Sequence, residues 1–208
     1  MPSPFDQSTY QVRLDWGLAG LERLADADVV VIVDVLHFST AVVDAVAAGG
    51  EVDLSQAAEW SSDAVAPAIA VTAAAGGAVV LIGSIRNASA VARAVQVIQE
   101  QRQARTSVAL IATGARDASN DVRFTVEDQL GAGAIIAALT DLGIDHTAPD
   151  AAVAAEGFRA LRRALGHLLS ASGSGQEAED AGSVATAARL DAVAVVPRFD
   201  DRRFLPFV

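Results

Sequence analysis

A carboxylate and two hydroxyl groups follow an apolar stretch early in the chain. Asp34 comes directly after residues 29–33, and Ser39 and Thr40 lie where a helix is expected to begin. Such a turn can bind a metal through the carboxylate and a phosphate through the hydroxyls and the N–H groups of the helix start. In the structural alternative, Ser39 only caps the helix and Asp34 satisfies loop amides. His37 can serve as a proton donor or simply as a turn residue.

A second polar turn follows the apolar residues 78–83. It contains Ser84, Arg86 and Asn87. The planar guanidinium group of an arginine suits a phosphate or a sulfonate, small residues let a ligand approach the backbone, and Asn87 can cap or ligate. The structural alternative is a Ser or Asn cap beside a solvated arginine.

A third candidate is the pair of adjacent carboxylates Glu127 and Asp128, in the first turn of a predicted helix. Paired acids there can hold Mg²⁺ or orient a water molecule. Alternatively, the acids favour the helix dipole, and Thr125 with Asp128 forms a capping box. The sequence alone leaves both interpretations open.

Several kinds of chemistry are excluded by composition. The chain has no cysteine, which removes disulfides, thiolate zinc sites and cysteine nucleophiles. All fifteen basic residues are arginine, which removes a Schiff-base lysine and a Walker-type phosphate loop. The three histidines are scattered, which indicates no zinc site. The Gly131-Ala132-Gly133 sequence lies inside a predicted helix, which favours helix packing over dinucleotide binding.

Alternating strands and helices must position these residues. The hydrophobic pattern predicts strands at 11–16, 28–34, 51–54, 78–83, 107–112 and 192–196, and helices at 18–24, 39–48, from 55, 87–103, from 126, 150–169 and 176–190. Residues 63–77 show no clear period, and residues 113–124 are expected to form a polar loop. This order predicts an α/β fold, a three-layer α/β/α sandwich with a mostly parallel (mixed) sheet. Because ligands gather at the carboxyl ends of such strands, the three polar turns are expected to share one pocket.

Composition also limits size, location and partners. With 208 residues, 52% of them hydrophobic and 20% charged, we expect a single domain over residues 1–208 with a large core. A net charge of −11 and the lack of an arginine–aromatic cluster argue against nucleic-acid binding. The apolar runs are too short to cross a bilayer and no signal peptide is recognised, so we expect a cytoplasmic protein without a membrane partner. Its apolar helices are compatible with a homodimer.

Four ordered blocks of this sequence resemble the 2-phosphosulfolactate phosphatase family. They are Asp34-Val35-Leu36-His37-Phe38-Ser39-Thr40, Gly83-Ser84-Ile85-Arg86-Asn87, Val126-Glu127-Asp128-Gln129-Leu130-Gly131-Ala132-Gly133 and Leu190-Asp191-Ala192-Val193-Ala194-Val195-Val196-Pro197. The resemblance spans about residues 11–197, and four blocks in the same order are much more specific than any one of them.

The resemblance implies Mg²⁺-dependent hydrolysis of a phosphate monoester on a small sulfonated or carboxylated hydroxy acid, a step of coenzyme M synthesis. It implies roles in metal and water handling for Asp34, Asn87, Glu127 and Asp128, of which Asp34, Glu127 and Asp128 are the candidate metal ligands. His37 is added to these catalytic candidates by its residue type and its place in the first turn. It also implies that the substrate and its phosphate are bound by Ser39, Thr40, Ser84 and Arg86.

The sequence departs from the family pattern at three places. His37 stands where the family usually has an arginine or a small residue, and Ser183 replaces an aspartate. The short segment 63–77 lacks both a Gly-Glu-containing loop and an Asn-Gly-Thr or Asn-Gly-Ser turn. These departures motivate the alternative hypothesis of a catalytically impaired member that binds a small anion or acts as an assembly subunit. An ordinary α/β domain with an unrelated ligand is the third possibility, if all three turns are only caps.

Overall fold

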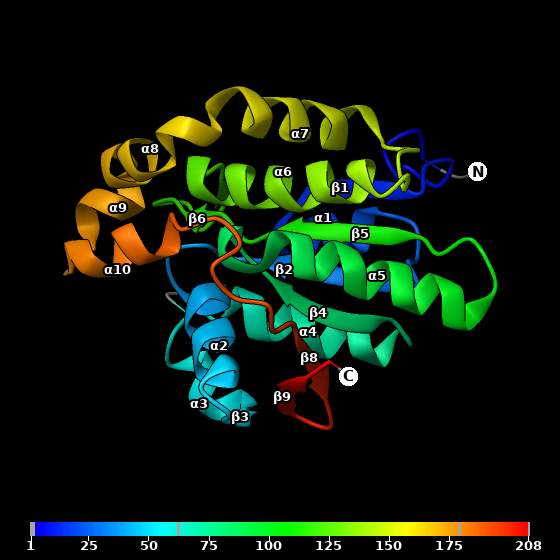
Figure 1. Ribbon diagram of the computed structural model, residues 1–208, viewed down its shortest axis with the longest axis horizontal. Helices are drawn as coiled ribbons and strands as arrows, with labels where there is room; N and C mark the ends of the chain where they lie inside the picture. Colours follow the sequence, from blue (N-terminus) through cyan, green and yellow to red (C-terminus); the bar gives the residue numbers. More distant parts are fainter. Residues whose placement is uncertain (1–2, 62, 179, 208) are drawn as a thin grey trace.

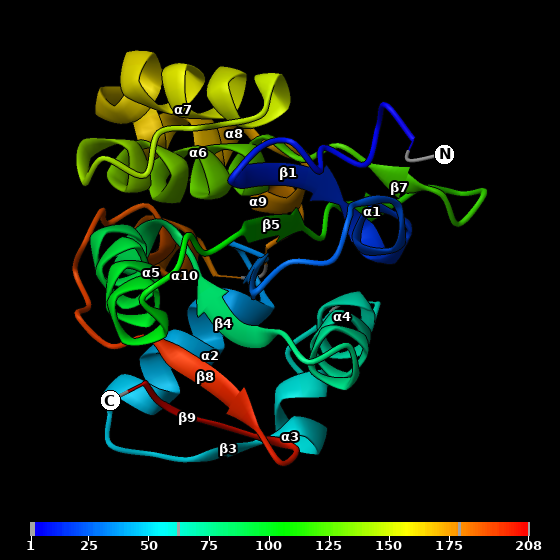
Figure 2. The same cartoon turned by 90° about the vertical axis from the view of Figure 1, so that its right-hand side faces the viewer.

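A seven-stranded mixed sheet forms the centre of the protein. The computed structural model describes residues 3–61, 63–178 and 180–207. The strand order is β1-β5-β2-β4-β8-β9-β3, and Figure 2 shows the sheet descending from β1 to the β8–β9 pair. The first four strands are parallel, and the last three join by antiparallel pairing. In sheet order, the bounds are Val12–Trp16, Val108–Ala112, Val29–Val33, Val79–Gly83, Pro197–Asp200, Arg203–Pro206 and Val52–Asp53.

The central strand β2 shows why the sheet needs a helical layer on each face. All five of its residues, VVVIV, are buried. Side chains alternate along a strand, so Val29, Val31 and Val33 belong to one core and Val30 and Ile32 to the other. β-branched residues on both faces are typical of a parallel strand that is covered on each side.

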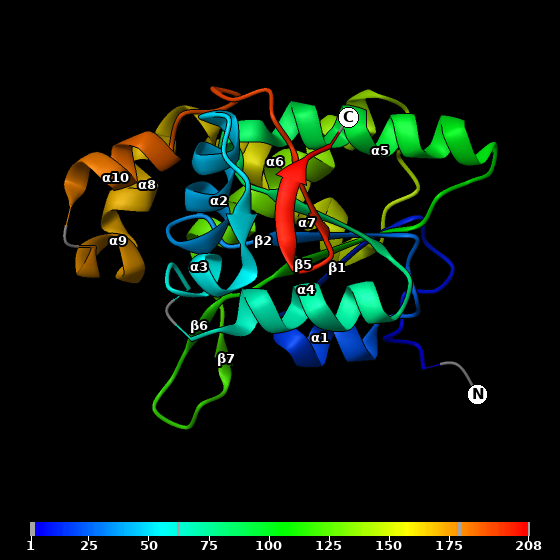
Figure 3. The ribbon, with the colours of Figure 1, turned by 90° about the horizontal axis from the view of Figure 1, so that it is seen from below.

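Helices cover both faces of the sheet (Figures 1 and 3). One core packs against α5 (Ala88–Arg102), α6 (Val126–Asp141), α7 (Pro149–Leu161), α8 (Leu165–Ala171) and α10 (Ala181–Ala187), with α9 (Gly173–Glu177) between the last two. The other core packs against α1 (Gly17–Arg23), α2 (Phe38–Ala47), α3 (Leu54–Ala58) and α4 (Val65–Ala75). Short 3₁₀ turns occupy Ile85–Asn87 and Arg162–Ala164. This arrangement confirms the predicted three-layer sandwich with a mixed sheet. None of the helices within the described ranges is both long and apolar enough to cross a membrane.

The strand predicted at 192–196 is wrong. These residues contain no strand, and β8 begins only at Pro197. The backbone there is satisfied by the turn after β4: Val193 N–H donates to the Arg86 carbonyl at 2.9 Å, and the Val195 carbonyl accepts from Asn87 Nδ2 at 3.0 Å. An apolar run alone does not distinguish a strand from a segment that crosses the end of a sheet.

The helix predictions need three corrections. Residues 63–77, expected to have no clear period, contain α4, in which Ala66, Ile69, Ala70 and Ala73 are buried at helical spacing. The helix expected at 150–169 is interrupted by a 3₁₀ turn, and the one expected at 176–190 by the residues between α9 and α10. Alanine has the highest helix propensity, so α4 forms without the strong amphipathic contrast on which the prediction relied.

The polar loop predicted at 113–124 contains a small hairpin. Strands β6 (Ala115–Arg116) and β7 (Val122–Arg123) pair in antiparallel register. The Asp117 carboxylate closes the turn by accepting from the N–H groups of Ser119 at 2.8 Å and Asp121 at 3.0 Å. Residues 114–124 are called the β6–β7 hairpin below.

Candidate functional site

The candidate site lies at the carboxyl ends of the parallel strands. The three polar turns of the sequence follow β2, β4 and β5, which are adjacent strands of the sheet. Figure 1 shows α2, β6 and α8 to α10 gathered at the same end of the molecule. Open α/β sheets bind ligands at this edge, because loops there leave a crevice between strands that connect in opposite directions.

The β2 turn (residues 34–37) presents a buried carboxylate. The Asp34 N–H donates to Ser39 Oγ at 2.9 Å, and that hydroxyl donates to the Ile32 carbonyl at 3.2 Å. Thr40 Oγ1 donates to the Val35 carbonyl at 2.6 Å. Ser39 and Thr40 therefore hold the turn together from inside the helix, and neither hydroxyl caps the helix start, where the N-cap residue is His37.

Asp128 joins the turns after β2 and β5 to the start of α6. Its Oδ1 accepts from the Val35 N–H at 2.8 Å. Its Oδ2 accepts from the Gly114 N–H at 3.0 Å and from the hydroxyls of Thr125 at 2.9 Å and Thr113 at 3.3 Å. The expected capping box is absent because Thr125 donates to this carboxylate and accepts no backbone hydrogen bond. Asp128 is a buried anchor whose two oxygens both have protein donors.

The two buried aspartates share an unfavourable electrostatic environment. Burial raises the pKa of Asp34 well above its usual value, and repulsion from Asp128 and then Asp63 adds to this effect. Burial, together with the charge of Glu127, raises the pKa of Asp128 to about 7, even though its hydrogen bonds favour the ionised form. Removing a carboxylate from water disfavours its charge, and a neighbouring negative charge does the same.

Asp63 was missed by the sequence predictions. Its Oδ1 accepts from the Val65 N–H at 3.1 Å. Its Oδ2 is buried, lies 3.4 Å from Arg116 Nε, and has no hydrogen-bond partner among the described residues. Asp63 precedes α4, in the segment that was expected to carry no chemistry. Once α4 is recognised as a helix that packs beside β2, a carboxylate at its amino end becomes a site candidate.

The β4 turn (residues 84–87) is internally satisfied. Asn87 is fully buried; its Oδ1 accepts from the Ser84 N–H at 2.9 Å, and its Nδ2 donates to the carbonyls of Ile82 and Val195. Ser84 Oγ accepts from the Arg86 N–H at 3.1 Å. The cap of the structural alternative is confirmed for this turn, whereas the solvated arginine expected beside it is wrong, because Arg86 is buried. The catalytic role of Asn87 and the ligand-binding role of Ser84 stay predictions.

Arg86 is engaged with two helices. Its Nε and Nη2 contact Asp44 Oδ1 of α2 at 2.9 and 2.8 Å, and its Nη1 donates to the Thr186 carbonyl of α10 at 2.9 Å. The side chain is 9% exposed. An anion that bound Arg86 would compete with Asp44 for the same guanidinium group.

His37 and Glu127 occupy different parts of the site. The His37 side chain is 42% exposed, and its Nδ1 lies 4.0 Å from Asp34 Oδ1. Glu127 is only 3% exposed and lines a hollow of about 280 Å³. The β6–β7 hairpin supplies Arg116 and Arg123 to the same hollow, and the α8–α9 turn closes it. We call this hollow the hairpin pocket. Arg123 was also missed by the sequence predictions, because residues 113–124 were expected to form a loop and the pairing of β6 with β7 was not recognised.

Two carboxylates, Asp34 and Asp63, are the candidates for a magnesium site among the described residues. Among the described residues, no group of three or more His, Cys, Asp or Glu side chains is arranged to hold a metal. Asp34, however, is buried and is repelled by the charge of the partly buried Asp63, whose Oδ2 has no hydrogen-bond partner among the described residues and lies 3.4 Å from Arg116 Nε. Mg²⁺ is commonly bound by one or two carboxylates together with substrate phosphate and water. The metal roles of Glu127 and Asp128 stay predictions.

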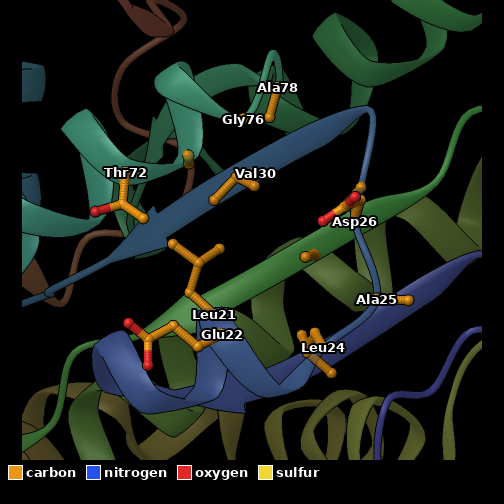
Figure 4. A pocket seen from close by; sticks show the side chains of 12 residues that line it. Leu21, Glu22, Leu24, Ala25, Asp26, Val30, Thr72, Gly76 and Ala78 are labelled. Carbon is orange, nitrogen blue, oxygen red and sulfur yellow. The ribbon is translucent and has the colours of Figure 1, made fainter. Parts of the chain in front are cut away.

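A second hollow lies near the amino ends of the strands. It encloses about 230 Å³ between α1 and α4, above Val30 of β2 and Ala109 of β5 (Figure 4). Its floor is apolar, and its acidic residues, Glu22 and Asp26, are exposed. It contains none of the predicted site residues.

Comparison with known families gives one match. A family model described as 2-phosphosulpholactate phosphatase matches residues 67–202, roughly two thirds of the chain. The matched segment contains the β4 turn, the β6–β7 hairpin and the start of α6, whereas Asp34 and Asp63 precede it. No curated protein matches the chain.

Proposed function

Because the chain belongs to the 2-phosphosulpholactate phosphatase family, we propose that it hydrolyses the phosphate monoester of a small sulfonated or carboxylated hydroxy acid with Mg²⁺ as cofactor. In this reaction water adds its oxygen to phosphorus, the ester P–O bond breaks, and the hydroxy acid leaves with a proton. The supporting observation is the buried Asp34 carboxylate at the carboxyl end of β2, whose pKa is raised by burial and by the charges of Asp128 and Asp63.

Asp34 and Asp63 would hold the ion in this proposal. Their mutual repulsion disfavours two negative charges in the metal-free protein, and a divalent cation between them would remove that penalty. When bound, Mg²⁺ supplies positive charge that stabilises the phosphoryl oxygens in the transition state. Asp128 would position the Asp34 turn through its hydrogen bond to Val35.

Glu127 and His37 would handle protons. Glu127 lines the hairpin pocket and has no hydrogen-bond donor among the described residues, so its carboxylate is available to accept a proton from the attacking water. His37 is exposed beside Asp34 and would protonate the leaving ester oxygen.

Phosphate release tests this proposal. The purified protein is expected to release inorganic phosphate from 2-phosphosulfolactate or a related phospho-acid with Mg²⁺, and to stop when EDTA is added. Asp34→Asn is expected to lower the rate by about 10³-fold, as is typical when a preorganised electrostatic group is lost. Asp53→Asn, at an exposed position on β3, is the matched control and should keep full activity.

The alternative of an impaired family member makes a different prediction. It is supported by the β4 turn, where Asn87 and Arg86 are committed to contacts within the protein. Under this alternative, a calorimetric titration detects binding of a phospho-acid, but no phosphate is released across the panel. Turnover that persists in Asp34→Asn would contradict the assignment of Asp34.

A further inference from the structure

The β6–β7 hairpin brings two guanidinium groups to one pocket. Arg116 and Arg123 lie on opposite strands, in the register Ala115 with Arg123 and Arg116 with Val122, and both line the hairpin pocket. The chain as a whole carries a net charge of −11. The same pocket is also lined by Glu127 and Glu177, so its two arginines balance two acids and make it less acidic than the chain as a whole.

The two arginines differ in their contacts. Arg116 is held by the Asn120 carbonyl at 2.9 Å and by Asp63, whose Oδ2 lies 3.4 Å from its Nε. The Arg123 side chain makes no hydrogen bond or ion pair with any residue that the structure describes, and it is exposed. Arg116 is thus a positioned charge near the carboxylates, and Arg123 is available to a ligand.

The pocket is lined by charges of both signs. Glu127 is buried where helix α6 begins, whereas Arg123 of the hairpin and Glu177 of α9 are exposed on the lining of the same pocket. A ligand that matches this arrangement has a free anionic group at one end, which pairs with Arg123. At its other end it has a group with a bound cation, which lies near Glu127. A phosphate ester accompanied by Mg²⁺, on a molecule with a separate free acid group, has this distribution of charge.

We infer that Arg123, assisted by Arg116, binds the acid group of the substrate that is not hydrolysed, a sulfonate or carboxylate, and so determines specificity for phosphorylated acids over neutral phosphate monoesters. This inference rests on the proposed function. A guanidinium group can donate two parallel N–H bonds to a sulfonate or carboxylate. Ser172 and the flanking helix α9, which includes Ser174, limit the size of the acid that the pocket admits.

A comparison of two substrates tests the inference. Arg123→Gln is expected to lower kcat/KM for 2-phosphosulfolactate by about tenfold, mainly through a higher KM, since a hydrogen bond to a charged group contributes about that much. The kcat/KM for p-nitrophenyl phosphate, which has no second acid group, should not change. Arg123→Lys should restore part of the loss. Arg93→Gln, an exposed arginine on α5, is the control for the loss of one positive charge.

Equal loss for both substrates, or no loss for either, would overturn the inference. A second measurement separates it from the proposed function. In a calorimetric titration, sulfolactate itself is expected to bind the wild-type protein about tenfold more tightly than Arg123→Gln. If no phosphate ester is hydrolysed, the proposed function fails, yet this titration still decides the role of Arg123. Equal affinity for both proteins, or no binding to the wild type, would overturn the inference.

Discussion

The β2 turn and the β4 turn each place a polar side chain and a serine at the end of neighbouring parallel strands, but they use them differently. In the β4 turn, Asn87 satisfies both of its polar groups with the surrounding backbone. In the β2 turn, Asp34 is buried against Asp128 and Asp63, and its pKa is raised. An amide both donates and accepts, whereas a carboxylate only accepts, so only the amide can satisfy N–H and carbonyl groups together.

This difference distinguishes the β4 turn, which supports the fold, from the β2 turn, whose carboxylate is available for chemistry. A turn whose groups are all paired gains nothing from a ligand, while a turn with mutually repelling acids is stabilised by a cation or a proton. Perturbed carboxylates in a crevice are typical of functional sites, whereas satisfied buried amides are typical of a scaffold.

The largest expected effect is a pH dependence from Asp34 of the β2 turn and Asp128 of α6, to which the β4 turn contributes no carboxylate. An unfolded aspartate ionises near pH 4, whereas the folded Asp128 has its pKa raised to about 7 by burial. Between pH 4 and pH 7 the folded protein binds more protons than the unfolded chain. The free energy of unfolding should therefore fall by about 1 kcal/mol per pH unit as the pH rises, and become constant above about pH 7. Denaturant unfolding in EDTA checks this. Asp34→Asn removes one of the repelling charges, so its slope should be shallower; an identical slope would contradict the coupling.

The next effect concerns the β4 turn. Asn87→Ala removes three hydrogen bonds and leaves the Ser84 N–H and the Ile82 and Val195 carbonyls without this partner. We expect a loss of about 3 kcal/mol in the free energy of unfolding, measured in urea. Gln101→Ala, an exposed amide on α5, is the control and should change stability by less than about 0.5 kcal/mol. A similarly small effect of Asn87→Ala would show that this turn is not the support described.

The smallest expected effect compares single hydroxyls in the two turns. Thr40→Val removes the hydrogen bond to Val35, and Ser84→Ala removes the acceptor of the Arg86 N–H. Each should lower the free energy of unfolding by about 1 kcal/mol. Phosphate release at a temperature where both variants are folded should decrease only for Thr40→Val, because only the β2 turn carries a proposed metal ligand. Equal decreases would remove the functional distinction between the turns.

The sequence predicted the parallel part of the sheet because β2, β4 and β5 are short apolar runs and β1 alternates apolar and polar residues. The antiparallel hairpin β8–β9 was not predicted, since residues 192–196 were a more apolar candidate than Pro197–Asp200. Strand choice there depends on which backbone groups are already paired. The Asn87 side chain donates a hydrogen bond to the Val195 carbonyl, and no local sequence pattern predicts this long-range contact.

The candidate site was predicted in part for a related reason. Position after a strand identified Asp34, and position at a helix start identified Glu127 and Asp128. Asp63 and Arg123 belong to segments whose structure was not recognised, α4 and the hairpin, so their convergence depended on contacts between distant segments. Whether the side chain of an asparagine or aspartate forms hydrogen bonds to the backbone is likewise decided by the fold and not by its neighbours in sequence.

The Gly114 N–H bond to Asp128 links the two ends of the proposed ligand site. Gly114 opens the hairpin in a left-handed conformation, with φ of +67°, and a β-carbon there would lie 2.5 Å from the Arg123 carbonyl oxygen. The hairpin consequently rests on the same carboxylate that fixes the Val35 backbone beside Asp34. In the proposed site, a displacement of β7 would therefore reach the Asp34 backbone through the Asp128 side chain, so binding of the substrate's acid group and positioning of its phosphate would be coupled.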